Sequence, residues 1–184
     1  HTPEEPLYVV AIGAITNVAS ALLMEPELTS RVVIVWLGGN GFEWPDTEEF
    51  NMRQDVAAAR VVFGSGAALV QLPCMGVVSA FTTTGPELKA HLAGRNALCD
   101  YLVQHTLDEV AAYNTDGIWS RVIWDVTAVG WLMGGELMED RIVPAPIPQY
   151  DHHYSHTPAR HPMRYVWHIH RDALMRDLIR KLTE

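Results

Sequence analysis

Charged residues are scarce in this sequence, and basic ones are scarcer still. They make up 19% of the 184 residues, with 13 Lys and Arg against 22 Asp and Glu, so the formal net charge is -9. Globular proteins usually carry about 25% charged residues, and a chain that is 48% hydrophobic is neither disordered nor a solvated linker. The negative balance argues against nucleic acid or an anionic membrane as a partner. One compact domain with a sizeable core is expected.

Cysteines are few, and long apolar runs and a recognisable beginning are missing. The two cysteines, Cys74 and Cys99, cannot build a disulfide framework, which favours reduced thiols and a cytoplasmic location. No apolar run approaches the roughly 20 residues of a membrane span. The chain starts at His1 with neither an initiator methionine nor a signal-peptide pattern. We therefore expect it to be cut from a longer protein.

Apolar runs and helical patterns alternate along the chain. Short runs rich in β-branched residues predict buried strands at Leu7–Ile12, Arg31–Leu37, Ala67–Leu72 and Arg164–His170. Helical spacing or capping residues predict helices at Asn17–Met24, Gln54–Phe63, Pro86 to about Tyr113, Val126–Met133 and Asp172–Leu182. The alternate prolines of Ile142–Tyr150 indicate an extended edge segment. The order favours an α/β fold with a mostly parallel sheet flanked by helices.

Polar clusters follow the first two of these strands, at Gly13–Asn17 and Gly38–Asn51, and a third, Trp124–Asp125, follows the apolar pair Val122–Ile123. Ligands of such folds bind beyond the carboxyl ends of the strands, so these clusters are the candidate site. The loop Gly38–Asn51 offers carboxylates and amides without a basic residue, which suits a polyhydroxylated ligand or a hard cation. The alternatives are ordinary solvated loop residues and, for Gly13–Asn17, a plain helix cap.

Four blocks of the sequence, VAIGAITNVASAL, VVIVWLGGN, EEFNMRQDVAAARVVF and WDVTAVGWL, resemble successive blocks of the nucleoside hydrolases. This is the inosine-uridine-preferring family of N-ribohydrolases, and the resemblance runs from about Leu7 to Leu182. It implies a Rossmann-like fold and calcium-dependent hydrolysis of the N-glycosidic bond of ribonucleosides, giving free base and ribose. It also implies a homo-oligomer, a dimer or a tetramer.

The resemblance assigns roles to five positions. Thr16 resembles the residue that offers its backbone carbonyl to the bound Ca2+, and Asp125 resembles the carboxylate that ligates Ca2+ and approaches the ribose. Glu49 and Asn51 resemble binders of the ribose hydroxyls, and Asn40 is the candidate for a further asparagine of that set. Calcium takes six to eight oxygen ligands, and a ribose diol can supply two of them. Such a grip favours the oxocarbenium character expected when the bond to the base breaks.

Trp124 departs from the inosine-uridine pattern. A histidine precedes the calcium aspartate in those members and protonates the leaving base, whereas tryptophan has no titratable proton. Purine-specific members of the family resemble this sequence, with an indole stacked on the base. Stacking favours a protonated, cation-like purine, whose proton could come from solvent, so Trp124 and Asp125 are the catalytic candidates and purine preference is the hypothesis. The alternative is a core aromatic.

The aspartate-rich calcium loop of the family has no counterpart among these residues. It follows the first strand of the family and carries the aspartate that activates water. We therefore interpret residues 1–184 as the carboxyl-terminal part of a single nucleoside hydrolase domain, lacking its first strands. A paralogue that binds a nucleoside or sugar without catalysis is the rival hypothesis.

Histidines gather near the end of the chain, six of the nine lying between His152 and His170. The spacing in Asp151–His156 and His161 fits no standard zinc site. We interpret this segment either as a solvated loop or as a cover for the pocket that supplies a proton to the base. His168 and His170 are expected to be packed or capping residues, and Cys74 a buried inert thiol.

Overall fold

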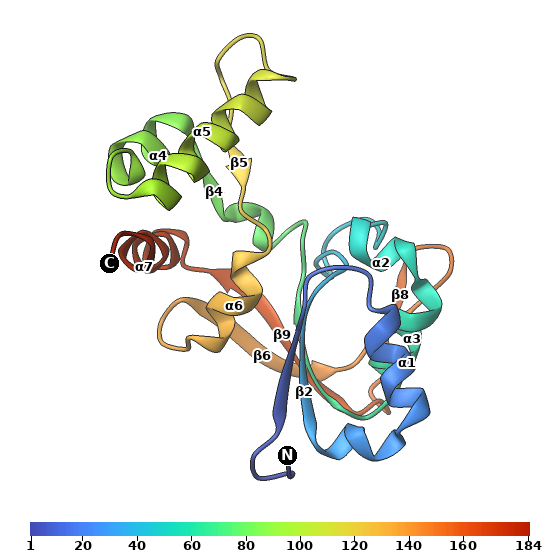
Figure 1. Cartoon of the computed structure of the whole chain (residues 1–184). Coiled ribbons are helices and arrows are strands. Elements are labelled where there is room, and N and C mark those ends of the chain that lie inside the picture. Colours follow the sequence, from blue (N-terminus) through green and yellow to red (C-terminus); the bar gives the residue numbers. More distant parts are fainter.

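The computed structural model describes residues 1–184, and its centre is a five-stranded sheet (Figure 1). The strand order is β1-β2-β3-β9-β6. β1, β2, β3 and β9 are parallel to one another, and β6 is antiparallel to β9. The bounds are β1 Leu7–Ala11, β2 Val32–Leu37, β3 Ala68–Leu72, β6 Met138–Pro144 and β9 Pro162–Ile169. This confirms the predicted α/β fold with a mostly parallel sheet.

Helices cover both faces of the sheet. Successive residues of β2 point to opposite faces, so Ile34 and Trp36 join one core cluster while Val35 and Leu37 join the other. The first cluster is closed by α1 and α3, and the second by α6 and α7. The bounds are α1 Thr16–Met24, η1 Pro26–Ser30, α2 Phe50–Gln54, α3 Val56–Gly64, α6 Val126–Leu132 and α7 Arg171–Thr183. Burial on both faces explains why the strands read as continuous apolar runs.

A helix pair projects from one end of the sheet (Figure 1). Its helices α4 and α5 pack on α7 through a small cluster of their own, and two short strands, β4 and β5, connect the pair to the rest. Arg171 fastens this unit, because its guanidinium donates to the carbonyl of Thr82 and pairs with Glu87. The bounds are η2 Val78–Ala80, β4 Thr82–Thr83, α4 Gly85–Leu92, α5 Ala97–Ala111 and β5 Arg121–Val122, with the hairpin β7 Ile147–Pro148 and β8 Tyr154–Ser155 elsewhere.

One predicted helix begins later than expected, and another is split. The helix expected at Gln54–Phe63 is α3, which begins at Val56 because Asp55 Oδ1 accepts the N–H of Ala58 at 2.9 Å, and Gln54 instead ends α2. The helix expected from Pro86 to Tyr113 breaks before Asn96, whose side chain accepts the N–H of Cys99 and starts α5. In each case the side chain satisfies a free amide of a new helix.

Two other expectations concern the ends of elements. Asn17, predicted as a helix cap, lies inside α1, whose capping residue Ile15 makes no side-chain bond. The segment Ile142–Tyr150 was expected at an edge, and the strand that contains its start, β6, is indeed outermost. The remaining edge is β1, which pairs only with β2 and leaves Leu7 and Tyr8 about half exposed. None of the helices combines the length and apolar character needed to span a bilayer.

Gly39, just after β2, can be replaced only at a high cost in stability. Its φ of 71° lies in the left-handed region, and a Cβ there would strike Tyr154 Oη and Met52 Cε. Strain and overpacking each cost on the order of 1–3 kcal/mol, so we expect Gly39→Ala to lower the free energy of unfolding by about 3 kcal/mol in urea titrations. Gly66→Ala is the control, since Gly66 has a φ of 82° but open space around it. Equal losses in both variants would contradict the packing argument.

Candidate functional site

A cavity of about 450 Å³ opens where the parallel strands end. Ile12 follows β1, Leu37 ends β2, and Cys74 and Met75 follow β3. The remaining lining residues come from the loop before α2 and from the residues before α6; they are Glu49, Phe50, Asn51, Trp124 and Asp125. Four of the six predicted site residues therefore line one cavity, although they come from two distant parts of the chain.

Glu49 is 9% exposed and holds the backbone around the cavity. Its Oε2 accepts the N–H of Gly39 at 2.9 Å and that of Met52 at 3.0 Å, and its Oε1 accepts the N–H of Asn51 at 2.9 Å. The same carboxylate therefore caps α2 and closes the turn after β2. Because a carboxylate can accept about four hydrogen bonds, Oε1 retains the capacity for one more.

Asn51 ties two strand ends together. Its Nδ2 donates to the carbonyl of Leu37 at 2.9 Å and to that of Ile12 at 3.3 Å. Both partners are acceptors, so the side-chain amide must present its NH2 group to them, which leaves Oδ1 without a partner in the chain. Asn51 is 7% exposed and lines the cavity, so its free acceptor is available to a ligand that donates a hydrogen bond.

Burial raises the pKa of two groups that line the cavity, Asp125 and Cys74. Asp125 stands before α6 but does not cap it, and its carboxylate has no hydrogen-bond or ion-pair partner in the chain. Burial raises the pKa of Asp125 above its usual range. Burial raises the pKa of the Cys74 thiol far more, with the carboxylates of Glu49 and Asp125 adding to the rise. Cys74 is therefore a neutral thiol and no nucleophile at physiological pH.

Aromatic and apolar side chains form the remaining walls of the cavity. Trp124 is partly buried against the second core cluster, and its carbonyl accepts the hydroxyl of Thr127 at 2.6 Å. Phe50 is 66% exposed, although it lines the cavity. Phe50 and Met75 were missed as wall residues from the sequence, and the signal for Met75 was its position directly after a buried strand. A flat ring could lie between such walls.

Two predicted site residues do not line this cavity. Asn40 is 2% exposed, and its amide is fully used: Nδ2 donates to the Asp46 carbonyl at 3.1 Å, and Oδ1 accepts the N–H of Met75 at 3.2 Å. The Asn40 side chain therefore stabilises the loop Gly38–Asn51 and has no free group for a ligand. Thr16 is exposed, its Oγ1 donates to Asp55 Oδ2 at 2.7 Å, and its carbonyl accepts the Ser20 hydroxyl at 2.8 Å.

The histidine-rich segment does not cover the cavity, contrary to one of its two interpretations. None of its residues lines that space. Tyr154 is instead packed into the first core cluster and bonded to Gln71 at 2.7 Å, and His156 lies edge-on to Phe42. The carbonyl of His152 accepts the N–H of Thr47 at 2.7 Å, which anchors the loop Gly38–Asn51 from behind.

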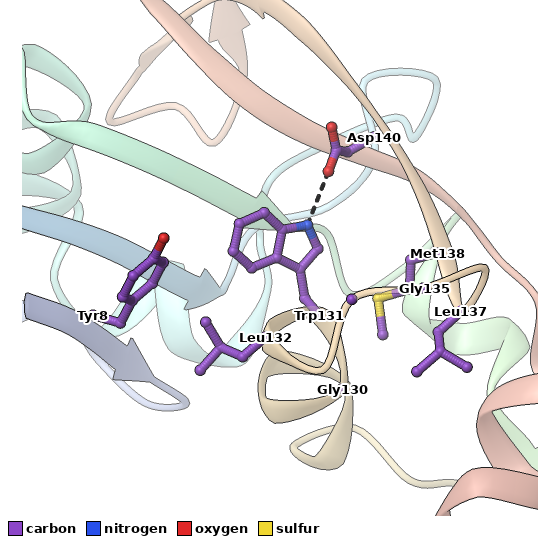
Figure 2. Close-up of a pocket in the computed structure, with 9 residues that line it drawn as sticks. Tyr8, Gly130, Trp131, Leu132, Gly135, Leu137, Met138 and Asp140 are labelled. Carbon is purple, nitrogen blue, oxygen red and sulfur yellow. Dashed lines mark hydrogen bonds between the residues drawn. The ribbon is translucent and has the colours of Figure 1, made fainter. Parts of the chain in front are cut away.

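A larger hollow of about 620 Å³ lies over one face of the sheet, between Tyr8 of β1 and Asp140 of β6 (Figure 2). Tyr8 of β1 faces it, and Trp131, Leu132 and Met138 form much of its apolar wall. Its carboxylate, Asp140, is already committed, since Oδ2 accepts Trp131 Nε1 at 3.0 Å and Oδ1 pairs with Arg164 at 2.6 Å. With no free reactive group, this hollow is a poorer candidate than the cavity at the strand ends.

Comparison with known proteins gives the family. The sequence profile described as inosine-uridine preferring nucleoside hydrolase matches residues 1–174. The chain belongs to this family. The recognition from the four sequence blocks is thereby confirmed, whereas the roles of individual site residues stay predictions.

Relatives of this nucleoside hydrolase chain include proteins of known specificity. The pyrimidine-specific ribonucleoside hydrolase RihA of Escherichia coli is 31% identical over 140 residues, which are 73% of this chain and 44% of RihA. This chain thus spans less than half the length of the relative it matches.

Solved structures of nucleoside hydrolases share the fold. The plant nucleoside hydrolase PpNRh1 superposes with a TM-score of 0.79 at 22% identity, covering 96% of this chain and 61% of that one. The inosine-uridine preferring enzyme of Bacillus anthracis gives 0.75 at 18% identity, with 97% and 60% covered. In both cases nearly all of this chain matches part of a longer nucleoside hydrolase.

Proposed function

We propose that the full-length protein hydrolyses the N-glycosidic bond of ribonucleosides, releasing free base and ribose, and that the cavity at the strand ends holds the sugar. One observation carries the proposal: the free acceptor capacity of Glu49 and Asn51 and the unpaired carboxylate of Asp125 converge on one space beside Trp124. Family membership supports the same chemistry.

The free acceptors suit the hydroxyl groups of a ribose. Glu49 Oε1 and Asn51 Oδ1 can each accept an O–H, and both side chains are held by hydrogen bonds to the backbone before the ligand arrives, Glu49 through Oε1 itself and Asn51 through Nδ2. Such preorganised acceptors lose little conformational entropy on binding. Fixing the hydroxyls orients the sugar ring, so that its anomeric carbon can develop positive charge as the bond to the base breaks. The carboxylate of Asp125 then stabilises that charge.

The cavity offers the type of ligand that calcium prefers, which is oxygen, but too few of them to complete a calcium site. Its ionisable oxygen donors are Glu49 and Asp125, no basic residue is present to repel a cation, and Asp125 has no partner. Calcium needs six to eight oxygens, so Asp125 would be one ligand among several. The Thr16 carbonyl stays a candidate from the family resemblance alone, because Thr16 lies outside the cavity lining and its carbonyl accepts the Ser20 hydroxyl. When bound, the ion would supply positive charge that attracts the ribose oxygens and lowers the pKa of a bound water.

The missing groups are proposed to come from residues outside this sequence. The 184 residues place no free carboxylate in the cavity besides Asp125 that could activate water, because Glu49 already accepts three backbone amides. The solved relatives are longer than this chain, which covers 60 to 61% of them. The unpaired edge of β1 leaves room for further strands beside the site. Residues 1–184 would then be the carboxyl-terminal part of one domain.

Trp124 is proposed to stack on the base and to favour purines. An indole beside the base stabilises the cation-like, protonated purine as it leaves, and no titratable side chain lies at this position. RihA is pyrimidine-specific, while a structural neighbour at 15% identity is an inosine-guanosine nucleoside hydrolase, so relatives with either preference share the fold. Whether Trp124 stacks on the base therefore distinguishes a preference for purines from a preference for pyrimidines.

Replacing Trp124 tests the stacking proposal. We expect Trp124→Leu to lower kcat/KM for inosine by about 10- to 100-fold, since stacked aromatic contacts and a lost cation–π interaction together cost on the order of 1–3 kcal/mol. The loss for uridine should be smaller, because a pyrimidine presents less ring area. Steady-state rates of the full-length protein with both nucleosides provide the measurement. Comparable turnover of uridine and inosine by the unmodified protein would refute purine preference.

Chelation tests the metal, and product release separates catalysis from mere binding. The full-length protein should release free base from inosine in calcium and lose this activity in excess chelator, with recovery when calcium is restored. The rival, a non-catalytic nucleoside- or sugar-binding paralogue, predicts binding of inosine without product under every condition. A dimer or tetramer stays a prediction for the full-length protein, to be checked by light scattering.

A further inference from the structure

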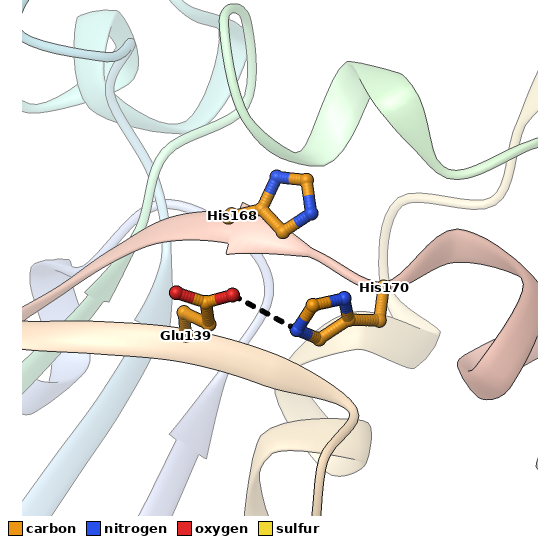
Figure 3. A group of neighbouring side chains, drawn as sticks. All are labelled: Glu139, His168 and His170. Atoms are coloured by element: carbon orange, nitrogen blue, oxygen red, sulfur yellow. Dashed lines mark ion pairs between the residues drawn. The ribbon is translucent and has the colours of Figure 1, made fainter.

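A second group of side chains with ligand chemistry lies away from the cavity, where β6 begins and β9 ends. Its members are Glu139, His168 and His170 (Figure 3). The three residues take no part in the proposed hydrolysis, and none of them lines the cavity at the strand ends. The sequence alone separates Glu139 from the histidines by almost thirty residues, so that only the folded sheet brings them together.

The pairing of β6 with β9 explains why the three side chains converge. Glu139 stands opposite His168 in the antiparallel register, and directly opposed residues place their side chains on the same face. His170 lies two residues after His168 and therefore points to that face as well. An irregularity between Glu139 and Asp140 shifts the register there, pairing Asp140 with Val166 and leaving Trp167 unpaired. Without that shift, Glu139 would face Trp167 instead of His168.

The distances suit a small cation bound between the three groups. One ligand atom from each residue lies within 4.8 Å of the other two, and Glu139 Oε1 is 3.0 Å from His170 Nε2. Tetrahedral zinc, with bonds of about 2.0–2.1 Å, holds its ligand atoms roughly 3.4 Å apart. All three side chains are at least partly exposed. They can therefore rotate to bring their ligand atoms from 4.8 Å or less to about 3.4 Å apart without disturbing the core.

The surrounding charges leave the group free for a cation. Glu139 pairs only with His170, and His168 makes no hydrogen bond within the chain. The nearest permanent cation in sequence, Arg171, is occupied by Glu87, Asp172 and the Thr82 carbonyl. Asp140, next to Glu139, is paired with Arg164. Two imidazoles and one carboxylate are ligands of zinc and related transition metals, whereas calcium prefers oxygen alone.

We infer that Glu139, His168 and His170 form a zinc site that is separate from the nucleoside cavity. The three protein ligands leave a fourth position for water, so the ion would be exchangeable rather than enclosed. It would also join the start of β6 to the residue preceding α7, because His170 is the capping residue of that helix. Zinc therefore stabilises the packing of the carboxyl-terminal helix against the sheet, since a ligand that binds only the folded state stabilises it.

The test is zinc titration of the metal-free full-length protein by calorimetry, with Co2+ absorption as a probe of coordination. We expect His168→Gln and His170→Gln to weaken zinc binding by about 100-fold or more and Glu139→Gln by at least about tenfold, since a lost ligand costs at least as much as a lost neighbour of a ligand. Zinc should raise the thermal midpoint of the unmodified protein and leave that of His168→Gln unchanged. Circular dichroism checks that each variant is folded.

Matched variants distinguish this site from other histidines and carboxylates. His153 also pairs with a carboxylate, Asp151, at 3.5 Å but belongs to no group of three. Glu136 is an exposed glutamate close to Glu139 in sequence. His153→Gln, Glu136→Gln and Asp125→Asn should all retain zinc affinity within about twofold, because they remove no ligand. Unchanged affinity in His168→Gln, or a loss in His153→Gln or Asp125→Asn, would overturn the inference, whatever the nucleosides show.

Discussion

Asp125→Asn in the full-length protein is expected to lower kcat/KM for inosine by about a thousandfold or more. In the proposed mechanism this change removes the negative charge that stabilises the sugar cation, and it weakens the proposed cation site. Metal-assisted charge stabilisation is worth several kcal/mol in a transition state, and about 4 kcal/mol corresponds to a factor near one thousand. The measurement is initial rates of base release over a range of inosine and calcium concentrations. Activity close to that of the unmodified protein would refute the role of Asp125.

The same substitution is not expected to unfold the protein. Burial raises the pKa of Asp125 in the folded chain above its unfolded value of about 3.9. The carboxyl group therefore contributes stability below the unfolded pKa, and this contribution is lost as the pH rises through the folded pKa. At neutral pH and without calcium, Asp125→Asn should keep or slightly raise the thermal midpoint, and the difference should disappear in acid. Asp108→Asn, on the exposed face of α5, is the control and should change neither activity nor stability.

Glu49→Ala is expected to lower the free energy of unfolding by about 3 kcal/mol, since each buried amide left without a partner costs roughly 1–3 kcal/mol and water entering the cavity can satisfy some of them. The amides concerned are those of Gly39, Asn51 and Met52. For a chain of this size the thermal midpoint should fall by about 10 °C. Glu48→Gln is the matched control, because Glu48 is the neighbouring glutamate but is exposed. Urea and thermal unfolding provide the measurement.

A sugar contact by Glu49 can be separated from this loss of stability. In the unmodified full-length protein, inosine should be preferred over its 2′- or 3′-deoxy analogue, because a buried acceptor is left unpaired when the hydroxyl is absent. In Glu49→Gln, assayed well below its unfolding temperature, that preference should shrink by at least about tenfold as one hydrogen bond to a charged group is lost. A preference that stays the same for both analogues would limit Glu49 to its backbone contacts.

The sequence predicted the parts of the site that depend on strand order. Strand order predicted that the clusters Gly38–Asn51 and Trp124–Asp125 lie at the carboxyl edge of the sheet, and the family resemblance selected Glu49, Asn51, Trp124 and Asp125 within them. These four residues line one cavity, while their roles stay predictions. The loop pattern did not distinguish Asn40 from Asn51, although both are buried amides. The difference is in their partners: Asn40 has used its donor and acceptor groups within its own loop, while Asn51 keeps Oδ1 free.

Contacts set by pairing register were beyond sequence reasoning. The group of Glu139, His168 and His170 depends on an antiparallel pairing with one shifted position, which no local pattern encodes. The later helix start after Asp55 and the helix break before Asn96 were missed for a different reason, because the apolar spacing continued across them. Both residues are typical helix caps, and giving capping signals more weight than periodicity would have found them.

The most direct measurement of the central claim is the identity and ratio of the products formed from inosine. The full-length protein, with calcium and without phosphate, is incubated with inosine, and free base and free reducing sugar are quantified together. Our account predicts hypoxanthine and ribose in equal amounts from the unmodified protein and neither from Asp125→Asn. Inosine that binds but is recovered intact would contradict the account and would make the protein a nucleoside-binding member of the family without catalysis.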